Sequence, residues 1–549
     1  MKKKVVALLL GLVMTVSVMT GCGNDTEVSK NTENATSETK NVEAETASKP
    51  TEVAKEDDSL YPLVDEPTTI KILYVSTFDF SKGRIVWDKV SEITGLDFEW
   101  TILDAETLPV YLAGGDWDFD VIHYKYLDAT TINDYGVTGG KFADYNDYLE
   151  YMPNLQKTFE DYPEALKAVK EANGAIYRLP SIEISATMTQ VRPYVRTDVL
   201  DAAGIKMPTT TDEFYQALKT LKQKNGVAAF CPTNLKETEY WGAMLYSAFG
   251  PSVNPDFEDD GKGNVVFMRT SEQYKHYLEF MNKLYEEELI DQEYLTVDSQ
   301  YTLGLAKEGK TAFLQNEAHS LAAEDFADGV FHLSCVAPLT SEYDSEQKVL
   351  AQLPVSANGF FLNAESENLV PLVQALDIMF ATEEVVEGSG LHGESFCYGL
   401  EGVHYVKNDD GTYELVAPEG YEGSFTDFQY NELIADNAGR ATDLEGYITS
   451  TPGNGQARQI GFRDNVFPYA CDNSEVFPTS MLKFTTEEQD VITTKYTDIK
   501  SHVNEMKAKF ITGLVDIETG WDEYCATIEQ MGIKEVLEQY QASYDRWNQ

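Results

Sequence analysis

Strand-like and helix-like segments alternate along most of this 549-residue chain, and this alternation restricts the fold more than any other feature. An apolar run at 70–75 is typical of a strand, and an apolar helical face at 86–93 follows it and ends at Gly95. The run at 118–124 again predicts a strand. Strands that alternate with helices predict an α/β architecture with largely parallel sheets.

Capping residues mark the predicted starts of several helices. Thr210 with Glu213 has the spacing of a capping box, and Thr270 with Gln273 has the same spacing before the next helix. A further helix is predicted at 369–381, where a proline falls in the first turn. These helices continue the alternation with the strands around them.

Two Asp-Asp-Gly tripeptides, at 259–261 and 409–411, lie between β-like runs and predict hairpin turns. The first of them follows Asp256, and its glycine stands where an EF-hand calcium loop needs a turn. Phe267, however, occupies the place of the closing Glu of such a loop. We therefore interpret this segment as a hairpin turn.

The C-terminal region has the most regular pattern. Thr485 and Glu488 can form a capping box, and apolar residues then recur at spacings of four and three until Gly513. This helical face consists of Ile492, Tyr496, Ile499, Val503, Met506 and Phe510. Two more helices are predicted, at 521–531 and 536–544, and all three apolar stripes are expected to lie in the core.

The N-terminus has the pattern of a secretory signal. Basic residues at 2–4 precede an apolar run that is too short for a permanent membrane span, and the sequence Thr-Gly-Cys ends it at Cys22. This ending resembles a bacterial lipoprotein signal, in which the cysteine is lipidated and becomes the first mature residue. Two acyl chains give a stable anchor. The alternative is an ordinary signal peptide with a chance cysteine.

We therefore predict a signal peptide at 1–21. The following segment, 22–59, is predicted to be a disordered tether, because it is polar, lacks aromatic residues and cannot bury enough apolar surface to fold.

Composition excludes some classes of partner. The net charge of −50 argues against nucleic acid, whose phosphates need Lys and Arg. Beyond the signal no basic run suggests binding to a membrane surface, so the lipid anchor is the one membrane contact that we predict. Of the six cysteines, none lies in a CxxC motif, and Cys231 and Cys335 are expected to be core residues because they lie in apolar stretches.

Motifs of catalysis are absent from the sequence, which has no HExxH, no GxSxG and no phosphate loop. Among 92 acidic residues some pair always has the spacing of a glycosidase, so carboxylates alone carry no information. We expect no enzymatic activity, no catalytic residue and no cofactor.

Several short motifs occur in an order that is found in one family. They include Gly-Ala-Ile-Tyr-Arg-Leu-Pro at 174–180, and the others lie at 111–121, 195–200, 284–291, 399–405, 495–499, 508–513, 521–524 and 540–546. Together they span nearly the whole mature chain. The chain resembles the family 1 extracellular solute-binding lipoproteins, mostly of Gram-positive bacteria, that deliver complex saccharides to ABC importers.

This resemblance implies a periplasmic-binding-protein-like fold (a flytrap), in which two α/β lobes are joined by hinge crossovers and followed by C-terminal helices. Lobe one would comprise 60–185 and 358–455, and lobe two 186–357 and 456–549. The lobes would close on an oligosaccharide. The resemblance further implies a lipid-anchored monomer on the extracellular face of the cell membrane, with ABC transporter permease subunits as its partners in carbohydrate transport.

One departure from the resemblance concerns calcium. Some relatives carry an acidic calcium loop after the helix that we place at 211–221. Here that place holds Lys-Gln-Lys-Asn-Gly at 222–226, which lacks the oxygen ligands. We therefore expect no metal site.

Sugar rings present apolar C–H faces to aromatic side chains and hydroxyls to polar ones, so such residues on loops at strand ends are the candidates for ligand binding. In lobe one they are Phe78, Asp79, Phe80, Arg84, Trp117, Tyr124 and Tyr126. In lobe two they are Arg192, Tyr194, Tyr240, Trp241, Asn316, Glu317 and His319. The glycine-rich segment 388–402 adds Phe396 and Tyr398. Core or rim packing is the alternative role of each aromatic candidate.

Two other functions stay open at this point. One is a surface glycan-active enzyme, and the other is a lipoprotein that binds peptides or senses its ligand. If Arg84, Arg192 and Arg196 converge, an acidic sugar becomes a credible ligand despite the negative charge of the chain.

Overall fold

A computed structural model describes residues 60–76, 85–183, 192–232, 237, 240–314, 332–351, 354–409, 411–416, 439–442, 454–471 and 476–549. The predicted signal peptide, Cys22 and the tether lie outside these residues. Residues 1–58 and 59–549 form separate units, and every described residue belongs to the second. No helix in the described ranges is long and apolar enough to cross a membrane.

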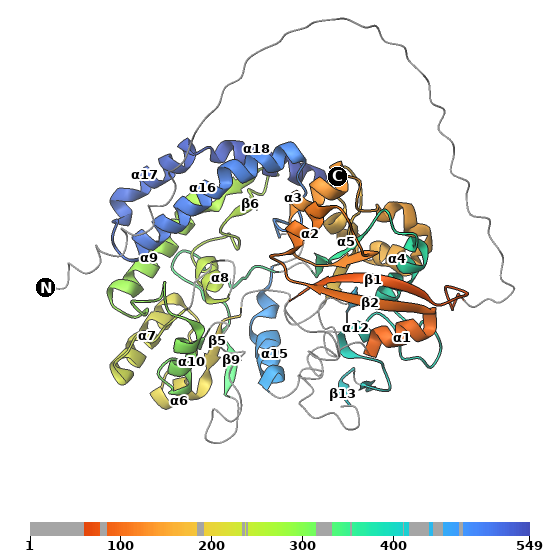
Figure 1. The fold of residues 1–549 in the computed structure, drawn as a ribbon. Coiled ribbons are helices and arrows are strands. Elements are labelled where there is room, and N and C mark those ends of the chain that lie inside the picture. Colours follow the sequence, from red (N-terminus) through yellow and green to blue (C-terminus); the bar gives the residue numbers. More distant parts are fainter. Residues whose placement is uncertain are drawn as a thin grey trace, which may run out of the picture. The chain divides into compact units, whose positions relative to one another are not determined.

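The first sheet has four strands in the order β11-β3-β1-β2, and Figure 1 shows two of them, β1 and β2, side by side. Its strands are β1 (Thr68–Val75), β2 (Leu96–Leu103), β3 (Val121–His123) and β11 (Phe360–Leu362). β1 is parallel to β2 and β3, and β11 is antiparallel to β3. The predicted strands at 70–75 and 118–124 are confirmed, the second being shorter than expected.

Helices surround this sheet. They are α1 (Ile85–Thr94), α2 (Leu108–Gly114), α3 (Ala129–Ile132), α4 (Pro153–Asp161), α5 (Pro163–Val169), α11 (Leu369–Asp377) and α12 (Ser395–Tyr398), with the short helices η2 (Asn133–Thr138), η3 (Tyr145–Tyr151) and η7 (Ile378–Phe380). α1 buries Val86 and Val90, as predicted, and ends before Gly95, whose φ of 77° suits a glycine at a helix end. The predicted helix at 369–381 is confirmed as α11 and η7.

A second, small sheet joins distant parts of the chain. Its strands, in the order β10-β4-β14, are β4 (Pro180–Glu183), β10 (Val355–Ala357) and β14 (Arg440–Ala441). β10 is antiparallel to β4, and β14 is parallel to it. This sheet therefore brings together the segments in which we expect the chain to cross between lobes.

The third sheet departs from the predicted parallel arrangement. Its strands, in the order β8-β5-β9, are β5 (Tyr194–Arg196), β8 (Phe313–Leu314) and β9 (Leu333–Cys335). Both neighbours of β5 are antiparallel to it. The α/β class is confirmed, but the expectation of largely parallel sheets is wrong for this region, because long connections separate its strands and leave their direction free.

The helices of this region are α6 (Thr197–Ala203), α7 (Thr211–Asn225), α8 (Tyr240–Ser247), α9 (Glu272–Glu286), α10 (Ser299–Lys307) and α15 (Asn454–Asn465), with η4 (Met268–Thr270) and η8 (Phe467–Tyr469). Thr210 caps α7 as predicted, because its side chain accepts a hydrogen bond from the backbone N–H of Glu213. The predicted cap Thr270 is wrong. Ser271 caps α9 instead, while the Gln273 amide turns inward and donates to the Ser252 carbonyl at 2.8 Å.

Both predicted hairpins are confirmed. β6 (Phe257–Asp259) pairs with β7 (Val265–Phe267), and β12 (Tyr405–Lys407) pairs with β13 (Tyr413–Leu415). Phe267 is buried in β7 and packs against Phe257. The end of the segment 256–267, which was compared with an EF-hand loop, is therefore a strand.

The C-terminal helices match the sequence pattern most closely. They are α16 (Thr486–Ile511), α17 (Ile517–Gln530) and α18 (Ile533–Trp547). Thr485 and Glu488 form the predicted capping box. Ile492, Ile499, Val503 and Phe510 are buried. α16 contacts α9 and α18, and α18 contacts β7, so these helices belong with the α9 region (Figure 1).

The buried apolar residues form two large groups from different parts of the chain. One group draws on 70–179 and 360–441. The other draws on 194–349 and 462–540. It includes the buried Cys335 and also Phe230, the residue before Cys231. Cys231 is itself 1% exposed, so both cysteines are core residues, as predicted. The lobe boundaries themselves stay a prediction.

Candidate functional site

The candidate site begins at the carboxyl ends of β1 and β3. From β1 the chain runs through α1 to β2 on one side, and it then returns to β3 on the other side of β1. In open α/β sheets, a crevice for ligands forms where the strand order reverses in this way. The segments that leave this point are 76–84, of which only Ser76 is described, and the stretch that follows His123.

Tyr124 and Tyr126 lie together in the stretch after β3. Their rings meet edge to face with 5.8 Å between centroids. Tyr126 is 70% exposed, which is unusual for so large an aromatic side chain. The Lys125 ammonium lies 5.1 Å from the centre of the Tyr126 ring. The two tyrosines, which the sequence predicted as ligand residues, therefore form an exposed aromatic surface at the strand ends.

The backbone around Asn358 and Gly359 fixes this surface next to the small sheet. The backbone N–H of Tyr124 donates to the Gly359 carbonyl at 2.6 Å, and that of Asn358 donates to Leu179 at 2.6 Å. A Cβ atom at Gly359 would collide with the backbone of Tyr124 and Lys125. Only glycine permits this approach, which holds the tyrosines beside the ends of β4 and β10.

Trp117 lies at the other end of β3. Its indole N–H donates to the Leu112 carbonyl at 3.1 Å, and its ring stacks on Phe119 with 5.2 Å between centroids. The Lys141 ammonium lies 5.9 Å from the ring centre. The structure thus does not bring Trp117 into the Tyr124–Tyr126 surface.

The second part of the candidate site lies at the start of β5. Arg192 precedes this strand, and its Nε atom is buried without a hydrogen-bond partner among the described residues. Tyr194 is buried in the strand itself. Arg196 is buried, and its guanidinium pairs with Asp198.

Trp241 is a core residue that supports the ends of two strands. It is fully buried, and its ring stacks on Phe214 with 5.0 Å between centroids. Its indole N–H lies 2.9 Å from the Leu314 carbonyl and 3.3 Å from that of Tyr194. The indole N–H of Trp241 therefore supports the backbone of β5 and β8, and burial leaves no ring surface for a ligand.

Phe396 and Tyr398 are also buried. Phe396 packs edge to face on Trp87 with 5.4 Å between centroids, and Tyr398 packs on Tyr405 and Tyr413. Neither presents a ring to solvent. The predicted residues Phe78, Asp79, Phe80, Arg84, Asn316, Glu317 and His319 lie outside the described residues, as does the side chain of Tyr240.

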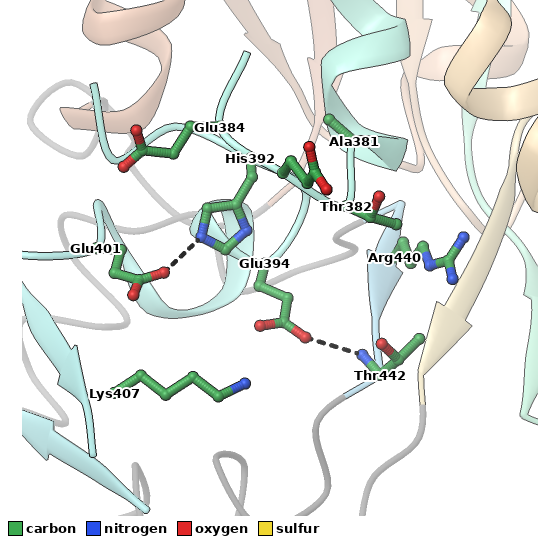
Figure 2. A pocket seen from close by; sticks show the side chains of 10 residues that line it. Ala381, Thr382, Glu384, His392, Glu394, Glu401, Lys407, Arg440 and Thr442 are labelled. Carbon is green, nitrogen blue, oxygen red and sulfur yellow. Dashed lines mark hydrogen bonds and ion pairs between the residues drawn. The ribbon is translucent and has the colours of Figure 1, made fainter. Parts of the chain in front are cut away.

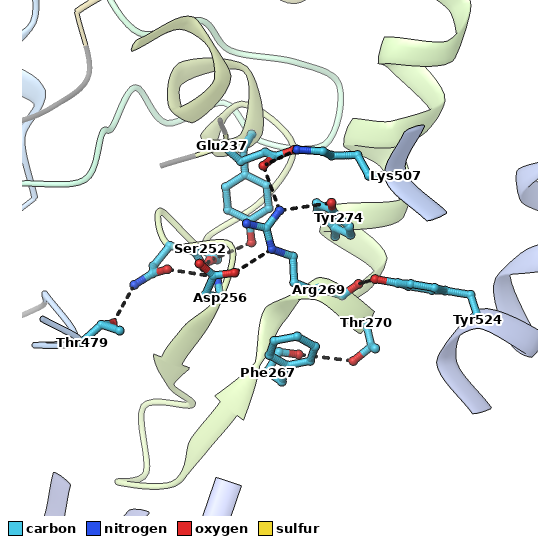
Figure 3. Close-up of polar contacts among 12 residues, drawn as sticks. Glu237, Ser252, Asp256, Phe267, Arg269, Thr270, Tyr274, Thr479, Lys507 and Tyr524 are labelled. Atoms are coloured by element: carbon cyan, nitrogen blue, oxygen red, sulfur yellow. Dashed lines mark hydrogen bonds and ion pairs between the residues drawn. The ribbon is translucent and has the colours of Figure 1, made fainter. Parts of the chain in front are cut away.

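A buried cluster of charges surrounds Glu237, which lies just before α8 (Figure 3). The Glu237 carboxylate receives Arg269 at 2.9 Å, and Lys507 of α16 lies 3.1 Å from it. Arg269 also donates to Asp256 at 2.8 Å and to the Tyr274 hydroxyl at 3.1 Å. Burial alone would raise the pKa of Glu237, but the two cations outweigh it and lower the pKa to about 2.

A polar pocket of about 460 Å³ lies near the second hairpin (Figure 2). Its lining residues are Ala381, Thr382, Glu383, Glu384, His392, Glu394, Glu401, Lys407, Arg440 and Thr442. Two of their carboxylates contact side chains of neighbouring segments. Glu401 pairs with His392 at 3.2 Å, and Glu394 accepts from the Tyr413 hydroxyl at 2.7 Å. We therefore interpret this pocket as a set of loop contacts.

Sequence reasoning missed Glu237 and the Asn358–Gly359 turn. Glu237 is one of 92 acidic residues, and nothing in its sequence neighbours separates it from the surface ones. The turn carried a weak signal, because an Asn-Gly pair between apolar runs often marks a special backbone conformation.

Comparison with known proteins identifies the family. The model of the family described as bacterial extracellular solute-binding protein matches residues 97–384, which is more than half of the chain. The chain belongs to this family. A second model, described as a domain of unknown function, matches residues 480–549, which contain α16, α17 and α18. The family is one of solute-binding proteins rather than enzymes, so the enzyme alternative is set aside.

Two similar proteins, and the structure of one of them, illustrate this family membership. The fructooligosaccharide ABC transporter substrate-binding protein FusA of Streptococcus pneumoniae is 23% identical over 89% of this chain and 92% of its own length. The polygalacturonan/rhamnogalacturonan-binding protein YtcQ of Bacillus subtilis is 21% identical over 82% of this chain and 86% of its own. The structure of S. pneumoniae FusA with kestose has a TM-score of 0.68 at 19% identity, covering 88% of this chain and 99% of that one. The periplasmic-binding-protein-like α/β fold is thereby confirmed.

Proposed function

We propose that this solute-binding protein captures an oligosaccharide and delivers it to the permease subunits of an ABC transporter. Membership of the solute-binding family carries the proposal, and FusA and YtcQ, which resemble this chain over most of its length, are named for oligosaccharide or polysaccharide ligands. The exposed Tyr124–Tyr126 surface supports a sugar over a peptide, because aromatic faces suit the C–H side of sugar rings.

In this proposal the ligand lies between the two predicted lobes. Tyr124 and Tyr126 belong to lobe one, at 60–185 and 358–455, and Arg192 belongs to lobe two, at 186–357 and 456–549. The two separate core groups support this division. Whether Arg192 and Arg84 converge at this ligand decides between neutral and acidic sugars, because converging arginines would favour an acidic one.

Tyr126→Ala tests the location of the site. We expect about a fivefold loss of affinity for the cognate oligosaccharide, because one stacked ring contributes about 1 kcal/mol. Tyr151→Ala is the matched control, since Tyr151 is an exposed tyrosine on η3. Thermal-shift screening with fructooligosaccharides, galacturonate oligomers and peptides supplies the ligand, and calorimetry then compares the variants. Stabilisation by peptides alone would refute the saccharide proposal.

We also propose that the mature protein is a monomer tethered to the extracellular face of the membrane through lipid on Cys22 and the flexible segment 22–59. The Thr-Gly-Cys ending of the signal supports this anchor. Cys22→Ser is expected to release the protein from the membrane fraction of the producing cells. Retention of the variant in that fraction would refute the anchor.

A further inference from the structure

A second pocket, of about 660 Å³, is lined by none of the predicted saccharide-binding residues. One wall comes from α4, α5 and the turn after them, and the other comes from α18 and the residues just before α16. The lining residues are Phe159, Pro163, Leu166, Lys167, Lys170, Glu171, Ala172, Asn173, Gly174, Met481, Lys483, Ser543, Arg546, Trp547 and Gln549. Pockets of this size are typical of sites for small organic molecules.

The charged side chains that line this α5–α18 pocket are mostly basic, although the chain as a whole carries a net charge of −50. Lys167, Lys170, Lys483 and Arg546 face one acidic residue, Glu171. Arg546 is neutralised by Glu488 outside the lining, at 2.8 Å. Lys170 has no ion pair or hydrogen bond among the described side chains. Excess positive charge therefore collects at this one place.

Part of that excess is buried. Arg178 and Lys483 share the Glu171 carboxylate, at 3.9 and 3.7 Å from Oε1, and these three side chains are only 10–13% exposed. Those distances exceed hydrogen-bond length, and Glu171 Oε1 and Arg178 Nε have no hydrogen-bond partner in the described part of the chain. Two buried cations thus have one carboxylate between them, and an uncompensated buried charge is costly.

The electrostatics of Lys483 agree with this imbalance. Burial, together with the neighbouring Arg178, lowers the pKa of the Lys483 ammonium to about 8 despite the opposing effect of Glu171. An anion beside this ammonium would supply the missing negative charge. The same pocket also offers apolar surface, because Phe159, Leu166 and Met481 line it.

Trp547 connects the two walls of the pocket. The Lys167 ammonium of α5 donates to the Trp547 carbonyl at 2.8 Å and lies 5.4 Å from the centre of its indole ring. The indole is therefore held at the rim, beside a cation, where it can cover one face of a planar apolar group.

We propose that the α5–α18 pocket is a second ligand site, which binds a small organic carboxylate with an apolar body. The carboxylate meets Lys483, with Lys170 at the entrance, and the apolar body lies against Trp547, Phe159 and Met481. An uncharged sugar would leave the buried charge without a counter-ion. A bare inorganic anion would satisfy the charge but leave the apolar surface in water.

Binding at this site links α5 to α18. Under the proposed lobe assignment these helices belong to different lobes, so a bound carboxylate would favour one arrangement of the two. The test below does not depend on that assignment, because it needs no saccharide.

Calorimetry and saturation-transfer NMR on the purified full chain test the site, with benzoate and phenylacetate as probes and benzamide as the uncharged control. We expect saturable binding of both carboxylates and none of benzamide. Lys483→Met keeps most of the side-chain volume but removes the charge, and it is expected to weaken carboxylate binding at least tenfold. Lys534→Gln is the matched control, because this exposed lysine lies on α18 but outside the pocket.

Each outcome decides the proposal. Loss of binding in Lys483→Met with retention in Lys534→Gln supports it, provided that both variants unfold at the wild-type temperature or above. Equal binding to Lys483→Met, equal binding of benzamide, or no saturable binding of either carboxylate overturns it. A variant with Tyr126→Ala is expected to bind benzoate normally, so failure of the saccharide proposal would not be mistaken for failure of this one.

Discussion

Two buried clusters in this molecule each place two cations around one glutamate, yet they differ in how far the charge is balanced. Around Glu237, Arg269 and Lys507 lie at 2.9 and 3.1 Å, and Asp256 adds a second carboxylate at 2.8 Å from Arg269. Around Glu171, Arg178 and Lys483 lie at 3.9 and 3.7 Å, and no second carboxylate pairs with either cation in the described residues.

The difference separates a structural cluster from one that is open to a ligand. The Glu237 cluster has two positive and two negative groups that pair at 2.8 to 3.1 Å, and Arg269 also donates to the Tyr274 hydroxyl. One of its carboxylate oxygens, Glu237 Oε1, has no hydrogen-bond partner in the described part of the chain, but the charges of the cluster balance. The Glu171 cluster retains a positive charge beside a pocket. Buried ionisable groups therefore indicate function here by their imbalance rather than by their presence.

Removing the acid from the balanced cluster is expected to have the largest effect. Glu237→Gln would remove the carboxylate that Arg269 and Lys507 share and leave Asp256 to pair with Arg269. We expect a loss of about 3–5 kcal/mol in the free energy of unfolding, because uncompensated buried charge is costly. Denaturant titration measures this loss. Glu505→Gln on α16 is the control, since its pair with Lys509 is exposed and such pairs contribute little. A change below about 1 kcal/mol in Glu237→Gln would contradict the structural role.

The two clusters are also expected to change the stability of the protein in different pH ranges, one acid and one alkaline. The folded pKa of Glu237 is lowered from 4.5 to about 2, so the stability that it contributes is present above pH 4.5 and is lost as the pH falls towards 2. The folded pKa of Lys483 is lowered from 10.5 to about 8, so the cost of its charge is present below pH 8 and is relieved as the pH rises towards 10.5. Each shift corresponds to roughly 3 kcal/mol at most.

To assign the acid-side change to Glu237 and the alkaline-side change to Lys483, the stability of wild type is measured across the pH range and compared with that of a variant of each residue. The difference between wild type and Glu237→Gln should shrink only on the acid side. The difference between wild type and Lys483→Met should change only on the alkaline side, where wild type gains. If the stability of Lys483→Met also rises at alkaline pH, the rise comes from another group.

How far the sequence predicts the molecule also differs between regions. The α16 face from Ile492 to Phe510, its capping box and both hairpins follow from local patterns, because spacing and turn residues determine them directly. The cap of α9 was placed one residue early, because Thr270 and Ser271 have equal chemistry and tertiary contacts draw the Gln273 side chain inward.

The candidate site was predicted less completely than the fold. Tyr124 and Tyr126 lie together after β3, and their role in ligand binding stays a prediction. Trp241 and Phe396 are aromatic residues of the same kind, but they lie in the core, and residue type alone does not separate these roles. The α5–α18 pocket was missed altogether, because Glu171 and Lys483 are more than 300 positions apart and only the fold brings them together.

The smallest expected change concerns the acid of the open cluster. Glu171→Gln would leave Arg178 and Lys483 without their shared carboxylate, but the pocket admits water. We therefore expect the free energy of unfolding to fall by about 2 kcal/mol, less than for Glu237→Gln.

Lys483→Met should instead leave the free energy of unfolding unchanged or raise it, because Arg178 alone would then face the Glu171 carboxylate. Thermal unfolding with and without benzoate measures both. Because benzoate replaces the missing negative charge, it should stabilise Glu171→Gln more than wild type and leave Lys483→Met unaffected. Equal stabilisation of all three proteins would show that the two clusters do not differ in the way that their charges indicate.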